Sequence, residues 1–220
     1  MKKVFLFIAL FIIPIVAYLF FASGVNTFIK LPVVTEKISE IPANLSTLNG
    51  NKIQLKNKIT VLGFTGSKID LVEGNITNLA HKIYDRNKDF VDFQVVYFVP
   101  VGSEDAINKL QNQLAVNIDL KNWHYVIATE DEIRAFYNQL GLIGKLDQNN
   151  GTSNVFIIDK ELKLRGRKGK NKEGNDEYRE GYNTISAADL HNEMADDVKV
   201  ILAEYRLALK KNNKVENITN

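Results

Sequence analysis

Four short apolar runs, separated by segments of helical character, constrain the fold of this chain more than any other feature. The runs are Ile59 to Phe64, Val91 to Val99, Trp123 to Ala128 and Asn154 to Asp159. Their length and their β-branched and aromatic residues are typical of strands that are buried on both faces. Because strands that alternate with helices form sheets with parallel pairs and helices on both sides, the sequence predicts an α/β fold.

The segments between these runs carry helix signals. Apolar residues recur every three or four positions, and Thr129 precedes an acidic first turn, which is a typical helix start. A last helix is expected after Ser186, with Asp189 at the capping-box position. The predicted helices cover residues 71–84, 103–114 and 129–141, and the last helix carries an apolar stripe from Leu190 to Leu209.

Shorter signals complete the order of elements. Asn49-Gly50 lies between two β-prone pieces and predicts a hairpin over Leu48 to Leu55. Residues 162–167 are expected to pair with the preceding strand, and the polar residues 168–183 are expected to form a surface excursion. This order, closed by a hairpin and a C-terminal helix, predicts a thioredoxin-like mixed sheet flanked by helices.

The first residues predict a membrane anchor. Lys2 and Lys3 precede an uncharged, mostly apolar run at residues 4–22, whose length as a helix nearly matches a hydrocarbon core of about 30 Å. The two lysines are expected to stay in the cytoplasm, which places the rest of the chain in the periplasm or outside. The chain is therefore interpreted as a single-pass protein of the inner (cytoplasmic) membrane, with a signal peptide, cleaved or uncleaved, as the alternative.

The remaining chain has the length of one domain. Residues 23–43 contain Gly and Pro without clear periodicity and are interpreted as a tether. The expected organisation is therefore an anchor at 1–22, a tether at 23–43, one domain at 44–210 and a frayed tail at 211–220.

Composition excludes several functional classes. The net charge of +2 is too small for a dedicated nucleic-acid binder, which usually has a clearly basic face, so no nucleic-acid partner is expected. The chain has no cysteine. A disulfide, a thiol nucleophile and a thiolate metal site are therefore impossible.

Individual motifs point to no catalytic site. The turn Gly63 to Lys68 lacks the spacing of a phosphate loop and is interpreted as a strand-to-helix turn, in which Gly66 provides the turn and Ser67 caps the helix. His81, His124 and His191 lie far apart, and no pair has metal-ligand spacing. No Gly-x-Ser-x-Gly nucleophile elbow is present. We therefore expect no catalytic residue, no cofactor and no metal.

A basic run at Lys163 to Lys172 is the densest cluster of positive charge. It is interpreted as a solvated hairpin and loop, balanced by the acids that follow at residues 173–180. The alternative is contact with anionic lipid headgroups or with an acidic partner.

The layout resembles the Sco/SenC family, membrane-anchored thioredoxin-like proteins of the bacterial envelope and of mitochondria. The resemblance covers roughly Leu48 to Leu207 and rests on the order and spacing of four pieces. These are "LNGNKIQLKNKITVLGFTGS", the entry hairpin and first core strand, "WHYVIATEDEIRAFYNQLGL", the Trp-containing strand and next helix, "SNVFIIDKELKLRGR", the closing hairpin, and "DDVKVILAEY", the final helix.

The functional residues of that family are two cysteines, separated by three residues in the loop after the first core strand, and a histidine just before the closing hairpin. In the family they bind copper or exchange thiols during assembly of cytochrome c oxidase. Carried over residue by residue, the cysteine positions fall on Ser67 and Leu71, and the histidine position falls near Gly151. None of the three side chains can serve as a soft ligand.

The resemblance implies the fold and the envelope compartment, and the replaced positions predict a non-catalytic domain. We expect it to act with a protein partner in assembly of cytochrome oxidase or of the envelope, while residues 4–22 contact the membrane. Two alternatives remain open, a thiol-independent enzyme that uses Ser67, Lys68 and Asp70, and a secreted carrier of a small ligand. The expected contact loop comprises Gly66, Ser67, Lys68, Ile69 and Asp70.

Overall fold

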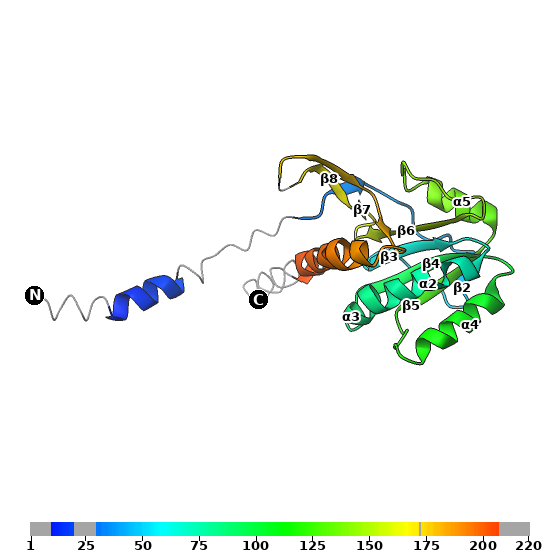
Figure 1. The fold of residues 1–220 in the computed structure, drawn as a ribbon, viewed down its shortest axis with the longest axis horizontal. Helices are drawn as coiled ribbons and strands as arrows, with labels where there is room; N and C mark the ends of the chain where they lie inside the picture. Colours follow the sequence, from blue (N-terminus) through cyan, green and yellow to red (C-terminus); the bar gives the residue numbers. More distant parts are fainter. Residues whose placement is uncertain (1–9, 20–29, 172, 207–220) are drawn as a thin grey trace, which may run out of the picture.

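A mixed β-sheet with helices on both faces forms the centre of the computed structural model, which describes residues 10–19, 30–171 and 173–206 (Figure 1). The strand order is β1-β7-β6-β3-β4-β5-β2, with β10 also paired to β6. β3, β4 and β5 run parallel, whereas β6 is antiparallel to β3. The four central strands are β3 (Ile59–Thr65), β4 (Phe93–Pro100), β5 (Trp123–Ala128) and β6 (Gly151–Ile158). The predicted α/β sheet and its four strand runs are therefore confirmed.

The central strands are buried on both faces because successive side chains point into two different cores. In β3, Val61 joins one apolar cluster and Leu62 joins the other. The first cluster lies under α2 (Ile69–Leu79), α4 (Glu104–Ala115) and the last helix. The second lies under α5 (Glu130–Asn138) and the chain around Ile38 to Leu55. Continuous apolar strands are thus the consequence of helices on both sides.

The helices follow the predicted order with shifted starts. α2 begins two residues before the predicted helix and continues through η1 (Ala80–Tyr84), a π-helical turn, into α3 (Asp85–Asn87). The last helix begins at residues 187–188, passes through a second π-helical segment, η2 (Asp189–Met194), and continues over residues 195–206. The hydroxyl of Ser186 accepts a hydrogen bond from Asp189 N at 3.1 Å, as the predicted cap requires.

The first predicted hairpin is wrong. The turn at Asn49-Gly50 forms, with Gly50 at a φ of 76° and its N–H donating to Thr47 O at 2.8 Å. However, residues 51–54 are not a strand, and β2 (Ser46–Thr47) pairs with β5 instead. The edge of β5 pairs with Ser46 and Thr47, so tertiary pairing overrides the local signal.

Residues 168–183 contain more regular structure than the expected polar excursion. β8 (Arg167–Lys170) and β9 (Asp176–Arg179) form a separate two-stranded hairpin. β10 (Tyr182–Asn183) then returns to pair with β6. The hairpin shows no apolar alternation because most of its side chains are exposed or half-buried, which is why the sequence does not reveal it.

The domain begins earlier than residue 44. β1 (Val33–Thr35), placed in the predicted tether, pairs with β7 (Leu164–Arg165), and Ile38 and Ile41 are buried in the second core. The guanidinium of Arg165 fixes this entry by donating from Nε to Leu31 O at 2.8 Å. The predicted boundary is therefore corrected, because Pro-containing segments without periodicity can still pack as an edge strand.

Residues 10–19, within the predicted anchor, are helical. Residues 1–9 and 20–22 of the anchor, residues 23–29 of the tether and the tail at 211–220 lie outside the described residues. Across the described ranges, no helix combines the length and the apolar character that a membrane crossing needs.

Candidate contact site

The predicted contact loop follows β3 and is fixed by close backbone contact. Gly66 has a φ of 69°, in the left-handed region that favours glycine. A Cβ at this position would lie 2.8 Å from Asn149 O and 2.9 Å from Gly151 N. The next residue, Ser67, donates its N–H to Asn149 O at 3.0 Å. Gly66 is therefore required both by its backbone conformation and by lack of space, as the sequence predicts for a turn.

The turn that faces Gly66 is itself held by hydrogen bonds. Asp147 Oδ1 accepts from the N–H groups of Asn149 and Gly151, each at 2.8 Å. Asn150, at a φ of 61° and buried, accepts a hydrogen bond from Arg134 at 2.8 Å. The loop after β3 and the start of β6 thus form one rigid backbone platform.

The start of α2 is not capped by a side chain. Lys68 occupies the N-cap position, and no side-chain oxygen accepts from the first turn. The expectation that Ser67 caps this helix is therefore wrong. Ser67 precedes the N-cap by one residue because α2 begins at Ile69 rather than at Leu71.

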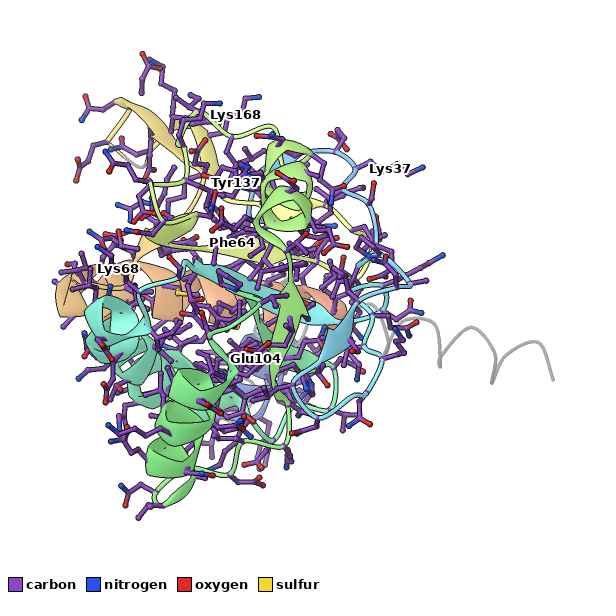
Figure 2. All side chains as sticks on the ribbon, turned by 90° about the vertical axis from the view of Figure 1, so that its right-hand side faces the viewer. Lys37, Phe64, Lys68, Glu104, Tyr137 and Lys168 are labelled. Atoms are coloured by element: carbon purple, nitrogen blue, oxygen red, sulfur yellow. The ribbon has the colours of Figure 1, made fainter. Side chains whose placement is uncertain are left out.

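Side chains of the contact loop divide into one anchor and three exposed polar groups. Ile69 is buried and packs in the first core. Ser67, Lys68 and Asp70 are exposed, and their side chains make no hydrogen bond or ion pair within the described part of the chain. Figure 2 shows Lys68 at this outer surface. None of these three side chains is hydrogen-bonded to another among the described residues, and the enzyme alternative stays a prediction.

A hollow of about 340 Å³ lies beside the contact loop. One wall is the start of α2 and the other is the turn before α4, so the hollow lies between two helix starts. Leu71, exposed by 71%, and Val101, exposed by 61%, add apolar surface near its two walls. The residues that line it are Ser67, Lys68, Ile69, Asp70, Leu71, Gly102, Ser103 and Ala106.

The side of the hollow that belongs to α4 is absent from the sequence prediction. Ser103 is the N-cap of α4, but its hydroxyl makes no capping hydrogen bond. Glu104 instead turns back, and its carboxylate accepts from Gly102 N at 2.7 Å. A serine followed by acids reads in sequence as an ordinary cap, so no local signal distinguishes this helix start.

The three positions that correspond to Sco ligands lie at the same end of the sheet but offer no ligand set. Gly66, next to Ser67, touches the backbone of Gly151, which pairs with Thr65 across β3 and β6. Leu71 is exposed on the first turn of α2. A hydroxyl, a methyl-bearing chain and a glycine do not fit copper(I), which prefers thiolate and thioether ligands.

The histidines do not supply such a site either. His81 lies on η1 and His191 on η2, both exposed, whereas His124 is half-buried on β5. Burial lowers the pKa of His124, with a smaller contribution from the charge of Lys58. Within the described ranges, no three His, Asp or Glu side chains are placed to hold a metal ion.

The basic run at 163–172 is largely neutralised within the domain. Arg165 pairs with Asp159 at 2.9 Å, and Lys170 pairs with Asp176 at 2.8 Å. Arg167 binds Asp197 at 2.9 Å and also contacts Glu177 and Glu193. The predicted balance is therefore only partly correct: Glu177 and Asp176 belong to the acids at 173–180, whereas Arg165 is buried and pairs outside that stretch.

Comparisons with known proteins identify the fold. No family model matches the chain, and no curated protein matches it. Among solved structures, BsSco, a member of the Sco family of cytochrome c oxidase assembly proteins, is 14% identical with a TM-score of 0.52, over 78% of this chain and 97% of that chain. A protein from Bacteroides thetaiotaomicron proposed to be a protein disulfide isomerase is 12% identical with a TM-score of 0.52, over 79% and 94%.

A third structure, of a proposed electron transport protein from Aquifex aeolicus VF5, is 18% identical with a TM-score of 0.50, over 76% of this chain and 98% of that chain. All three alignments cover nearly the whole of the known chain. At these low identities the likeness defines the fold alone. The chain thus has a thioredoxin-like fold of the kind that Sco proteins adopt, as the sequence predicts.

Proposed function

We propose that this chain is a non-catalytic, membrane-anchored Sco-like protein that acts as an interaction or accessory factor in assembly of cytochrome oxidase or of the envelope. It works without copper binding and without thiol exchange. Its domain faces the periplasm or the outside, and residues 4–22 hold it in the inner membrane. The contact loop, residues 66–70, is the surface that meets the partner.

One observation carries this proposal. The loop after the first core strand is held by the close contact between Gly66 and Gly151, while Ser67, Leu71 and Gly151 provide no thiol and no soft ligand. A backbone kept rigid beneath exposed, unpaired polar side chains suits recognition of a partner, since little ordering is needed on binding. The likeness to BsSco supports the choice of oxidase assembly as the process.

Co-purification from membranes tests the proposal. The full chain, tagged at its C-terminus, is extracted in mild detergent, and the eluate is probed for oxidase subunits and for a cysteine-containing Sco protein. We expect at least one of them to be retained by the wild type and lost with the double variant Lys68→Glu, Leu71→Asp. Lys168→Glu, an exposed change on the β8–β9 hairpin, is the matched control and should retain the partner.

Oxidase activity of membranes is a second measurement, which does not require the complex to survive in detergent. Deletion of the gene is expected to lower oxidase activity of isolated membranes, and the Lys68→Glu, Leu71→Asp variant should fail to restore it. Normal oxidase activity after deletion, together with a monodisperse protein that retains neither partner, would overturn the proposal.

A further inference from the structure

Two exposed apolar side chains lie next to each other on the loop that precedes β4. Phe90 is 42% exposed and Val91 is 79% exposed. Backbone hydrogen bonds hold the loop, since Phe90 N donates to Asn87 O and Phe93 N donates to Phe90 O, each at 3.0 Å. The ammonium group of Lys58 also donates to Val91 O at 2.9 Å. A fixed loop thus keeps two adjacent apolar side chains in water.

This loop lies at the end of the sheet where the chain enters the domain. Asp92, the last loop residue before β4, pairs with Lys160, whose ammonium group lies 5.6 Å from the centre of the Tyr205 ring. Glu204, the neighbour of Tyr205 on the last helix, pairs with Lys30 at 3.1 Å. Figure 1 shows α3, which precedes the loop, and the end of the last helix on the side from which residue 30 enters. Side-chain contacts therefore connect the loop to the start of the domain.

The sequence limits how far this end can lie from a membrane. Residues 23–29 separate the predicted anchor from residue 30, and a fully extended chain of that length spans about 25 Å. The inference rests on the proposed function, in which the anchor spans the inner membrane. The entry end of the domain, with Phe90 and Val91, is then the end nearest to the bilayer.

Charges around the loop are largely offset in pairs. Three lysine–aspartate pairs surround it, and they are Lys88–Asp85 at 2.6 Å, Lys121–Asp89 at 3.4 Å and Lys160–Asp92. These pairs do not give the excess of positive charge by which polybasic segments bind anionic headgroups. Apolar side chains with lysine stems around them instead suit the boundary between headgroups and acyl chains, whatever the charge of the lipid.

We propose that Phe90 and Val91 dock this end of the domain on the bilayer surface, at the level of the lipid headgroups. The occupant is a lipid surface rather than a protein, because two side chains give too little area for a stable protein interface. They suffice at a membrane because the anchor holds the domain beside it at an effective concentration on the order of millimolar. The docked domain presents its contact loop, at the opposite end, away from the bilayer.

Spin labels at the two ends of β4 test this docking. The chain has no cysteine, so one introduced cysteine places each label at a single position. Val91→Cys and Val101→Cys replace exposed valines before and after β4, about 30 Å apart along an extended strand. Each full chain is labelled and reconstituted in phosphatidylcholine nanodiscs, and access of oxygen and of a water-soluble nickel complex to the label is measured. The oxygen-to-nickel ratio is expected to be several-fold higher at position 91 than at position 101.

The possible outcomes separate the docking from the proposed function. Equal ratios at the two positions, in protein that has entered nanodiscs, would overturn the docking and leave the anchor intact. Protein that does not enter nanodiscs would overturn the anchor and the docking together. A high ratio at position 91 in native membranes but not in nanodiscs would indicate a protein occupant, which also contradicts the proposal.

Variants show whether apolar contact is the cause. In the Val91→Cys background, Phe90→Asp should lower the oxygen-to-nickel ratio to that of position 101. Val101→Asp, the matched control at the other end of β4, should leave the ratio unchanged. The hydrogen bonds through Phe90 are made by its backbone, so Phe90→Asp is expected to fold, and unchanged circular dichroism checks this.

Salt and lipid charge provide the last control. Raising the salt concentration, or adding the anionic lipid phosphatidylglycerol, should change the ratio at position 91 little, because the charges around the loop are paired. A ratio that falls at high salt would show that electrostatic attraction holds the domain, which contradicts docking through apolar side chains.

Discussion

The amino ends of α5 and α2 carry similar sequence signals but are built differently. At α5, the Thr129 hydroxyl accepts from Glu132 N at 3.3 Å, and Glu132 Oε2 accepts from Thr129 N at 2.9 Å, which closes a capping box. At α2, Lys68 occupies the N-cap and offers no acceptor. The first helix start satisfies its own donors, whereas the second leaves them open to the hollow. Two helix starts in one domain therefore differ in how much their own caps contribute to stability.

The difference between the two helix starts depends first on the turn at Gly66, which holds the start of α2 in place. Gly66→Ala should lower the free energy of unfolding by roughly 3 kcal/mol, since it adds a strained φ and a close contact with Asn149 O. Gly50→Ala is the matched control. Its φ of 76° is similar, but nothing lies within 4 Å, so a loss of about 1 kcal/mol is expected. Urea unfolding measures both, and equal losses would show that the platform at Gly66 is not rigid.

Removal of the closed cap should have the next largest effect. Thr129→Ala is expected to cost about 1 kcal/mol, because it leaves donors of α5 unsatisfied. Ser103→Ala at the open start of α4 should change stability by less than about 0.5 kcal/mol, since no capping bond is lost. If the two alanine variants lose the same stability, the distinction between closed and open helix starts fails.

The closed cap should also be sensitive to pH. The N–H of Thr129, followed by its hydroxyl, holds the pKa of Glu132 below its ordinary value. A depressed folded pKa stabilises the protein above the unfolded pKa of about 4.3, and this stabilisation is lost as pH falls through the lower folded value. The stability advantage of wild type over Glu132→Gln should therefore shrink on acidification below about pH 4. An advantage that is constant from neutral to acid pH would contradict the capping role of the carboxylate.

The smallest expected effect is an increase in the free energy of unfolding. Lys68→Asp places an acceptor at the open start of α2 and should raise the free energy of unfolding by about 0.5 kcal/mol. Thermal unfolding measures this gain, and a variant no more stable than wild type would show that the start of α2 does not need an acceptor.

Sequence reasoning recovers those parts of the fold that depend on local pattern. Runs such as Ile59 to Phe64 are buried on both faces, and Thr129 with Glu132 caps its helix as expected. The π-helical turn at Ala80–Tyr84 leaves no mark on apolar spacing, and the pairing of β2 with β5 depends on chain segments far apart in sequence.

In the candidate site, too, features that depend on local pattern could be predicted and features that depend on distant contacts could not. The contact between Gly66 and the turn at Asn149 follows from a glycine-bearing turn after a strand. The open start of α4 could not be predicted, because Ser103 followed by acids has the sequence context of a normal cap but makes no capping hydrogen bond. The start of α2 was placed on the wrong residue because Ile69 packs into the core just before the expected helix.

The bonds of Arg165 have a mechanical consequence. Its guanidinium links Leu31 O to Asp159 and to Glu204 of the last helix, and Gly166 N donates to Pro32 O at 3.0 Å. Figure 1 shows residues 30–32 entering the domain at the end where the last helix finishes, whereas α2 begins at the opposite end. Tension on the chain before residue 30 would act first on the hydrogen bonds between β1 and β7. The contact loop lies away from these bonds. If the proposed function is correct, force on the chain before residue 30 therefore leaves the shape of the contact loop unchanged.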